Sequence, residues 1–230
     1  MEQTVVQEIY KDTKLKPVRR IIAKNMHASL QEMAQLTLNT SFDARKLMAA
    51  RKACKASDDE DMQKITLNDM VLYAVAKVLP NHPALNSHFM GDFIRTFSVV
   101  NLGIAVDTPR GLLVPNIMEA EKMTLLELSK AAKMLIAGAQ TGKIDSNLLI
   151  NGTFTVTNLG SLGIESFTPV NNPPQTGILG VCASVNRIDN GGNTYPAMGL
   201  SLTFDHRALD GAPAARFLKE LCEFLTNFEL

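Results

Sequence analysis

The segment FDHRALDG, residues 204–211, contains the side chains of this chain best suited to proton transfer. His206 is one of four histidines in the chain, with Asp205 before it and Asp210 four positions after it. Imidazole has an ordinary pKa close to neutral pH, so it can take up a proton and return it. The segment separates an apolar run from an amphipathic one, which predicts a connection between a strand and a helix. A histidine held there by two rigid elements is well placed to act as a base.

Each residue of this segment also has an ordinary structural explanation. A loop histidine can serve packing or hydrogen bonding alone, and Arg207 could be solvated. An aspartate directly before a helix is a favoured N-cap, and Pro213 suits the first turn of a helix that begins just after Asp210. The residue types alone therefore leave catalysis and structure open as alternatives.

A second candidate for chemistry lies on a predicted strand. In the stretch GTFTVTN, apolar and hydroxyl side chains alternate, so that Phe154 and Val156 face one side. Thr153, Thr155 and Thr157 face the other side, where a hydroxyl could donate to a developing negative charge. Threonine is also common in strands because of its β-propensity alone.

Hydrophobic periodicity predicts the elements of the first part of the chain. Apolar residues recur every three or four positions over 18–35, which predicts a helix with one buried stripe. This stripe consists of Ile22, Met26, Leu30 and Met33. Alternation over 36–42 predicts a half-buried strand, after which Asp43 can cap a helix that continues through Cys54. Residues 55–61 are predicted to form a charged loop.

Capping patterns mark the next helices. Thr66 and Asp69 open a helix that ends at a proline, while Thr124 and Glu127 open a second helix that Gly142 ends. Strands are predicted over 97–108, 112–117, 152–158, 177–185 and 195–204, and a final helix packs Phe217, Leu221 and Leu225. Strand and helix do not alternate regularly, which favours an α+β layered domain over a Rossmann sheet. The glycines of NLGSLGIESF do not form the GxGxxG pattern of a dinucleotide site.

Composition narrows the function classes. The chain of 230 residues is 46% hydrophobic, which suits one large domain, and its formal net charge is zero. This charge balance disfavours nucleic acid and membrane partners. No apolar stretch approaches the roughly 20 residues that span a bilayer, and the first residues do not resemble a secretory signal. We therefore expect a cytoplasmic protein.

The cysteines and histidines do not suggest a metal site. Cys54, Cys182 and Cys222 are far apart in the sequence and odd in number, so we expect reduced core thiols rather than a disulfide framework. His82 and His88 are six positions apart, a spacing that does not place two imidazoles on one helical face. The sequence therefore predicts no metal.

Several long stretches together resemble a known family. DHRALDG is similar to the DHRxxDG signature of the dihydrolipoamide acyltransferases of 2-oxoacid dehydrogenase complexes. KPVRRIIAKNMHAS, NLGIAVDTPRGLLVPNI and GTFTVTNLGSLGIESFTPVNNPPQTGILGV resemble other segments of the same catalytic domain, in the same order. The resemblance implies a chloramphenicol acetyltransferase-like two-layer domain, in which helices pack on a mixed sheet. It also implies that the catalytic domain, over residues 18–230, forms trimers. Residues 1–17 have little periodicity, which predicts an N-terminal arm.

The resemblance also assigns roles to residues. His206 would be the general base that takes the proton from the thiol of coenzyme A, or from dihydrolipoamide in the reverse direction. Thr157 would donate its hydroxyl to the oxyanion of the tetrahedral intermediate. Asp210 would keep the catalytic segment in shape by pairing with an arginine of the opening helix, for which Arg19 is the matching position. In this family the histidine comes from one subunit of a homotrimer and the hydroxyl from its neighbour.

The physical chemistry suits these residue types. A thiol has an ordinary pKa about two units above that of imidazole, so transfer of its proton to His206 costs roughly 2.7 kcal/mol in water. One aligned hydrogen-bond donor at the developing oxyanion is worth on the order of 3 kcal/mol, which Thr157 could supply. The reaction then needs no covalent protein intermediate.

The partners follow from the same resemblance. Coenzyme A would be a substrate, and the lipoyl group would be carried on a separate lipoyl domain or chain. The dehydrogenase and dihydrolipoamide dehydrogenase components would be further partners. No lipoyl or subunit-binding domain is recognisable in the sequence, Asn151 occupies a position where glycine is common, and the chain ends in FEL without a long leucine tail. A trimer is therefore favoured over a larger cage.

Alternatives to an acetyltransferase remain open at this point. NLGSLGIESFTPVNNPPQ looks more like members that transfer acetyl in pyruvate or acetoin complexes than like succinyl- or branched-chain-specific members. A scaffold core with little activity would need none of His206, Thr157 and Asp210. An enzyme with a different acceptor, as in chloramphenicol acetyltransferase, is disfavoured by the DHRxxDG and PPQ segments.

Overall fold

The computed structural model describes residues 10–230, so the first nine residues of the predicted arm lie outside the described part. Helices occupy Pro17–Glu32 (α1), Arg45–Lys55 (α2), Glu60–Gln63 (α3), Leu67–Val78 (α4), Leu125–Thr141 (α5) and Gly211–Thr226 (α6). Strands occupy Gln35–Asp43 (β1), Ser87–Phe89 (β2), Ile94–Thr96 (β3), Leu102–Ile104 (β4), Asn116–Ile117 (β5), Phe154–Asn158 (β6), Gly177–Ile188 (β7) and Thr194–Asp205 (β8). The predicted α+β class is confirmed.

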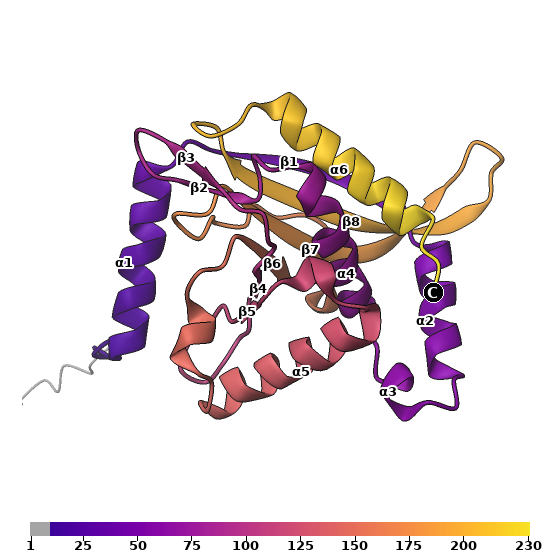
Figure 1. Cartoon of the computed structure of the whole chain (residues 1–230), viewed down its shortest axis with the longest axis horizontal. Coiled ribbons are helices and arrows are strands. Elements are labelled where there is room, and N and C mark those ends of the chain that lie inside the picture. Colours follow the sequence, from indigo (N-terminus) through magenta and orange to yellow (C-terminus); the bar gives the residue numbers. More distant parts are fainter. Residues whose placement is uncertain (1–9) are drawn as a thin grey trace, which may run out of the picture.

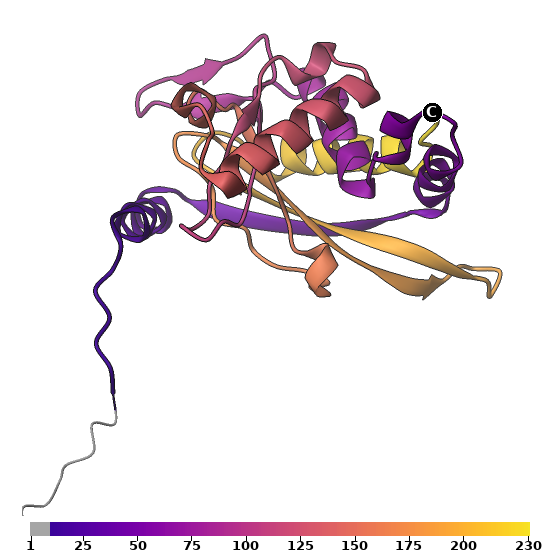
Figure 2. The ribbon, with the colours of Figure 1, turned by 90° about the horizontal axis from the view of Figure 1, so that it is seen from below.

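The main sheet is mixed. Its strand order is β1-β8-β7-β6-β4-β5, in which β6 runs parallel to both β4 and β7 while the other pairs are antiparallel. Strands β2 and β3 form a separate hairpin. Helices α4, α5 and α6 lie over one face of the sheet, and the long β7–β8 hairpin projects beyond them (Figures 1 and 2). This arrangement is the predicted two-layer domain.

The core lies between the sheet and these helices. Leu202 and Phe204 of β8 are fully buried, as are Phe217 and Leu221 on the facing side of α6. The alternation along β8 places these apolar side chains under the helix, because successive strand residues point to opposite faces. The end of β8, where the candidate site begins, is therefore fixed by packing.

Local capping signals in the sequence correctly located two helix starts. Thr66 with Asp69 and Thr124 with Glu127 each form a complete capping box, and Gly142 ends α5 in the left-handed region at φ 74°. The predicted cap of α2 is displaced by one residue. Ala44 is the N-cap, although Asp43 still accepts a hydrogen bond from the Arg45 backbone N–H at 3.0 Å. The predicted charged loop contains the short helix α3, which Asp59 caps.

Helix α1 differs from its prediction in burial. Of the predicted stripe, Met33 is buried, Ile22 and Met26 are only half-buried and Leu30 is 58% exposed. The prediction of a continuous buried stripe is therefore wrong for a single chain. The reason is position, because α1 stands beside the two layers rather than on the sheet (Figures 1 and 2). Near its C-terminal end, Ser29 is anchored by a hydrogen bond from its hydroxyl to the Asn171 carbonyl, at 2.8 Å.

The departure at Asn151 has a conformational explanation. Asn151 has a positive φ of 62°, in the left-handed region that glycine adopts freely and asparagine tolerates best among other residues. Its carbonyl accepts a hydrogen bond from the Asn101 side chain at 2.9 Å. The position before β6 therefore requires a left-handed backbone, which asparagine supplies.

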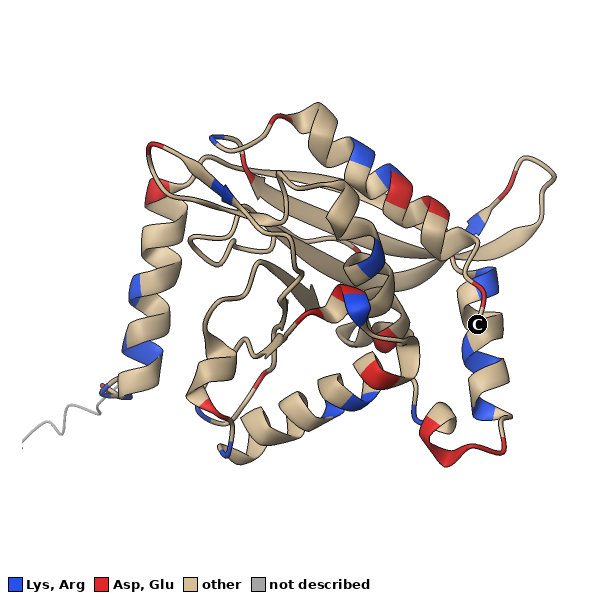
Figure 3. Ribbon diagram, viewed as in Figure 1, with Lys and Arg blue, Asp and Glu red and all other residues tan. Residues whose placement is uncertain are grey.

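Charged residues of both signs are spread over the described surface, as the zero net charge implies (Figure 3). Among residues 10–230, no helix combines the length and the apolar character that crossing a membrane requires.

Candidate active site

His206 lies immediately after β8, in the turn that leads to α6. Its backbone N–H donates to the Ala34 carbonyl at 2.8 Å, which ties the turn to the residue before β1. Its side chain is 43% exposed, and the ring centre lies 5.7 Å from that of the buried Phe204. The backbone of His206 is therefore held in place while its imidazole is accessible, as a general base requires.

The residues on either side of His206 form an ion pair between a buried carboxylate and a partly exposed guanidinium. Asp205 is fully buried and accepts from the Arg207 guanidinium at 2.7 Å and 3.0 Å. The Arg207 guanidinium also lies over the Phe89 ring, 4.2 Å from its centre. The hydrogen bond to Asp205 raises the pKa of Arg207. Arg207 is therefore partly solvated, with 37% of its side chain exposed, and is also held in place by this ion pair.

Asp210 occupies the N-cap position of α6 without acting as a side-chain cap. Its backbone has the extended geometry of an N-cap, yet its carboxylate accepts no capping hydrogen bond and is 86% exposed. Its Oδ1 lies 3.7 Å from His206 Nδ1. The cap alternative is not realised, and the carboxylate instead faces the imidazole.

Thr157 lies near the end of β6 and differs from the two threonines before it. Thr153 and Thr155 are buried and hydrogen-bonded, to Asn101 and Gln175 respectively. Thr157 is half-buried, and its hydroxyl makes no hydrogen bond to any other part of residues 10–230. This hydroxyl is the one of the three that is free to donate to a substrate.

One chain does not bring Thr157 and His206 together. Thr157 pairs with Gly180 in β7, and Gly180 pairs with Ser201 in β8. Asp205, which precedes His206, is four residues beyond Ser201, and this distance corresponds to roughly 13 Å along the strand. Two strand spacings add roughly 10 Å across the sheet. A single thioester carbonyl cannot contact both residues of the same chain.

Arg19 lies near the start of α1, away from Asp210. The guanidinium of Arg19 is near Gly111, 3.9 Å from the point that a β-carbon there would occupy. It is separated from Ser29, near the other end of the helix, by roughly 15 Å along the axis. Within residues 10–230 of one chain, no ion pair joins Arg19 to Asp210. The pairing of Asp210 with Arg19 therefore stays a prediction.

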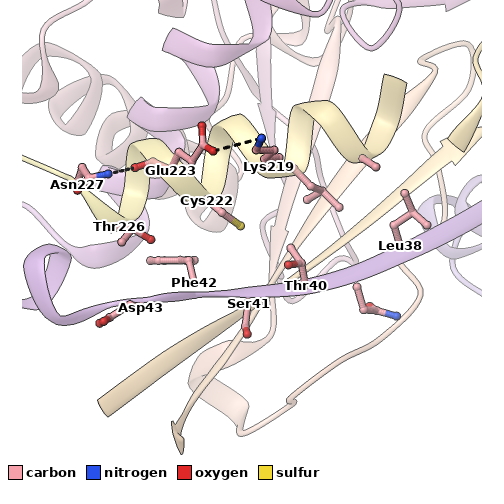
Figure 4. Close-up of a pocket in the computed structure, with 13 residues that line it drawn as sticks. Leu38, Thr40, Ser41, Phe42, Asp43, Lys219, Cys222, Glu223, Thr226 and Asn227 are labelled. Carbon is pink, nitrogen blue, oxygen red and sulfur yellow. Dashed lines mark hydrogen bonds and ion pairs between the residues drawn. The ribbon is translucent and has the colours of Figure 1, made fainter. Parts of the chain in front are cut away.

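A separate cavity of about 600 Å³ opens between β1 and the C-terminal half of α6 (Figure 4). Its lining includes Leu38, Phe42 and Cys222, together with Lys219 and Glu223 of α6. None of the predicted site residues contributes to it. This cavity is therefore not the candidate active site.

Metal and disulfide chemistry find no support in the described chain. Within residues 10–230, no cluster of three or more His, Cys, Asp or Glu side chains is placed to hold a metal ion. All three cysteines are free thiols, and burial raises the pKa of each of them. Their thiols are therefore poorly suited to act as nucleophiles at neutral pH.

Comparison with solved structures identifies the fold of this chain. A solved chloramphenicol acetyltransferase superposes with a TM-score of 0.58, over 88% of this chain and 94% of that one, at 14% identity. At that identity the likeness establishes the fold alone. The chain thus has the chloramphenicol acetyltransferase-like fold that the sequence predicted.

Sequence comparison identifies the family within that fold. Residues 7–230 match the family described as the catalytic domain of the 2-oxoacid dehydrogenase acyltransferases, and the chain belongs to this family. The acetyltransferase component of the acetoin cleaving system of Bacillus subtilis is 42% identical over 90% of this chain and 53% of its own length. The mitochondrial pyruvate dehydrogenase component of Schizosaccharomyces pombe is 35% identical over 95% and 46%. The chain thus spans about half the length of these relatives.

Solved structures agree with this assignment. The dihydrolipoamide acetyltransferase of Azotobacter vinelandii superposes with a TM-score of 0.90 at 33% identity, over 95% of this chain and 92% of that one. The cubic core of a pyruvate dehydrogenase complex gives the same TM-score and coverage at 32% identity. The Azotobacter structure was studied for the roles of a serine, a histidine and an asparagine in catalysis, the asparagine four positions after the histidine. His206 and Asp210 have the same spacing.

Sequence reasoning missed the ion pair between Asp205 and Arg207. The signal was present as an acid two positions before an arginine, and Asp43 and Arg45 form the same arrangement at the other end of β1. The missing information was burial, because an Asp-x-Arg sequence alone does not show whether the carboxylate faces the protein or the solvent.

Proposed function

We propose that this chain transfers an acyl group, most specifically acetyl, between dihydrolipoamide and coenzyme A. The observation that carries the proposal is the His206 imidazole, accessible to solvent and anchored at its backbone, in a chain of this acyltransferase family. The acetyl preference is supported by relatives that serve acetoin and pyruvate systems. The lipoyl group would arrive on a separate domain or chain, and coenzyme A would bind as a substrate.

The reaction starts with proton transfer from the acceptor thiol to His206. Asp210 lies on the Nδ1 side of the ring, which leaves Nε2 for the thiol, and its carboxylate would stabilise the imidazolium that forms. The thiolate then attacks the thioester carbonyl, whose electron pair moves to oxygen. When the carbonyl re-forms, the second thiolate leaves and takes the proton back from His206.

The oxyanion of the tetrahedral intermediate needs a donor that the same chain does not place nearby. The hydroxyl of Thr157 is free of other bonds, but the sheet register separates it from His206 of its own chain. We therefore propose a homotrimer in which His206 of one subunit faces Thr157 of the next. The exposed apolar residues Ile21 and Leu30 of α1 suit burial in such an assembly.

Larger assemblies and partners follow from the same proposal. A structural relative forms a cubic core, so we expect trimers of this chain to assemble into a larger core. The lipoyl domain, the dehydrogenase and dihydrolipoamide dehydrogenase would bind to this core. The proposed division remains an arm over residues 1–17 followed by the acyltransferase domain over 18–230. A cytoplasmic location is proposed with it, since the three free cysteines suit a reducing compartment.

A scaffold core with little activity is the second candidate function. The cubic core among the structural relatives favours an assembly role in general. It does not explain why a half-exposed imidazole, a facing carboxylate and a free strand hydroxyl are all present. The enzymatic proposal explains all three.

The test is an acyl-transfer assay with purified protein. Acetyl coenzyme A and dihydrolipoamide should yield acetyl dihydrolipoamide, with succinyl and isobutyryl donors used less well. His206→Ala should lower turnover by at least about 100-fold, because general base catalysis typically contributes a factor of that size. Full activity of the His206→Ala variant would refute the role of this base, and an inactive but trimeric wild-type protein would favour the scaffold.

A further inference from the structure

We infer that Asp205 and Arg207 are positioning residues for His206, a role that rests on the proposed acyl transfer. Neither side chain contacts the imidazole in the structure, so neither is placed to move a proton itself. Both act on the backbone that flanks it. The inference depends on how the two side chains connect three separate parts of the chain around the turn.

The Asp205 carboxylate binds both ends of this connection. Its Oδ1 accepts from the Ala34 backbone N–H at 3.3 Å and from the Arg207 backbone N–H at 3.1 Å. The His206 backbone N–H donates to the carbonyl of Ala34. Ala34 is therefore bound by both residues 205 and 206, and the peptide that carries the imidazole cannot rotate without breaking these bonds.

The Asp205 backbone is fixed as well. Its N–H donates to the Thr176 carbonyl at 2.9 Å, and its carbonyl accepts from Ala208 and Leu209 at 2.9 and 3.3 Å. The polar atoms of a fully buried carboxylate need hydrogen-bond partners, and here they are supplied by the turn itself and by Ala34. The loss of these partners in any other arrangement makes one geometry of the turn strongly preferred.

Arg207 completes the arrangement from the outer side. Its guanidinium makes a two-pronged contact with Asp205, a geometry that a lysine cannot reproduce. The other face of the guanidinium lies against Phe89, whose backbone N–H donates to the Pro174 carbonyl at 2.9 Å. Phe89 therefore packs against the guanidinium, which remains 37% exposed, and connects the turn to the β2–β3 hairpin.

The same chain contains a matched control at the other end of β1. Asp43 accepts from the Arg45 backbone N–H and from its guanidinium, and Arg45 lies over the Tyr195 ring at 5.5 Å. Here, however, the Arg45 side chain is 56% exposed, and neither residue neighbours a predicted catalytic group. Loss of this pair should affect the protein only through the modest stability of a surface ion pair.

The role predicts a specific kinetic pattern. Misplacement of a catalytic group by about 1 Å can cost about 100-fold in rate, so Asp205→Asn should lower kcat by about 10- to 100-fold. The KM values for both substrates should change less than about twofold, because substrate contacts are retained. Arg207→Met should give a similar loss, Arg207→Lys a smaller one, and the double variant Asp205→Asn/Arg207→Met no more than the larger single loss. Asp43→Asn should keep wild-type kinetics.

The measurement is kcat and KM per folded trimer, with trimer content determined by light scattering. If Asp205→Asn does not fold, Arg207→Lys and Phe89→Leu, which leave the buried carboxylate in place, supply the same test through their kcat values. Unchanged kcat in the folded variants, or equal losses in Asp43→Asn, would overturn the positioning role. Absence of activity in the wild-type protein would instead refute the proposed function, so the two failures are distinguishable.

Discussion

Thr157 of β6 lies level with Ser201 of β8 across a single intervening strand, and His206 follows Ser201 by five residues. This register separates the free hydroxyl from the accessible imidazole within one chain by far more than hydrogen-bond reach. Both residues can serve one reaction centre only if neighbouring subunits contribute them. Activity then depends on assembly, because a complete reaction centre exists only where two subunits meet.

Mixed trimers should therefore recover activity that each variant alone lacks. Equal amounts of His206→Ala and Thr157→Val subunits are unfolded together and refolded, so that they combine at random into trimers. Each contact between neighbouring subunits, here called a seam, then joins the histidine position of one subunit to the threonine position of the next. About a quarter of the seams in a closed ring then pair an intact histidine with an intact threonine. We expect about a quarter of the wild-type turnover from the mixture, measured in the acetyl-transfer assay.

Separately refolded variants, mixed only afterwards, are the control for this experiment. They should stay inactive as long as subunits do not exchange. No recovery in the co-refolded sample, with trimers confirmed by light scattering, would place both residues of each site in one chain and contradict the seam.

Thr157 itself should act through its hydroxyl rather than its shape. Thr157→Val keeps the branched side chain in β6 but removes the donor, so kcat should fall by about 100-fold or more with KM little changed. Thr157→Ser retains the donor and should keep most of the activity. If Thr157→Ser loses as much as Thr157→Val, a hydroxyl alone does not account for the activity and the role as donor is contradicted. If trimer content falls in parallel with rate, Thr157 is a structural residue.

Asp210 should matter for rate more than for the stability of α6. Its carboxylate makes no capping bond, so Asp210→Ala should change the melting temperature of the isolated subunit fold little. Turnover should fall, because the acceptor facing His206 Nδ1 is removed. Asp210→Asn keeps an oxygen acceptor, as in the Azotobacter relative, and should retain more activity than Asp210→Ala. Equal losses in the two variants would mean that the negative charge is required.

The parts of the fold that short-range signals determine could be predicted from the sequence. The capping boxes at Thr66 and Thr124 and the stop at Gly142 depend on residues within one turn of the helix end, and all three are present. The alternation over β6 similarly indicated a strand, although Thr155 is as buried as Phe154 and Val156. Such patterns depend on backbone periodicity, which the local sequence specifies.

Features that depend on distant segments could not be predicted in the same way. The buried carboxylate of Asp205 and its ion pair with Arg207 require β1, β8 and the β2–β3 hairpin to converge, and nothing in an Asp-x-Arg sequence encodes that convergence. The apolar spacing that includes Leu30 correctly indicated a helix but not what covers it. The distance between Thr157 and His206 likewise follows from strand register, which emerges only from the assembled sheet.

Cys222 should make the folded protein less stable at alkaline pH. Burial raises the pKa of its thiol to about 11, whereas an unfolded chain releases that proton at the ordinary thiol pKa of about 8.5. Between these values the unfolded state binds fewer protons, so the free energy of unfolding falls as pH rises from about 9 to 11. Below pH 8 the stabilisation that the protonated thiol gives to the folded state is fully present.

Cys222→Ala removes the titrating group. Because Cys222 lines the open cavity beside β1, the fold should tolerate this truncation (Figure 4). Urea unfolding at pH 8, 9, 10 and 10.5 should therefore show a steeper loss in the wild-type protein than in this variant, since lysines and tyrosines titrate equally in both. Parallel curves would show that the Cys222 thiol ionises in the folded state as readily as in the unfolded chain.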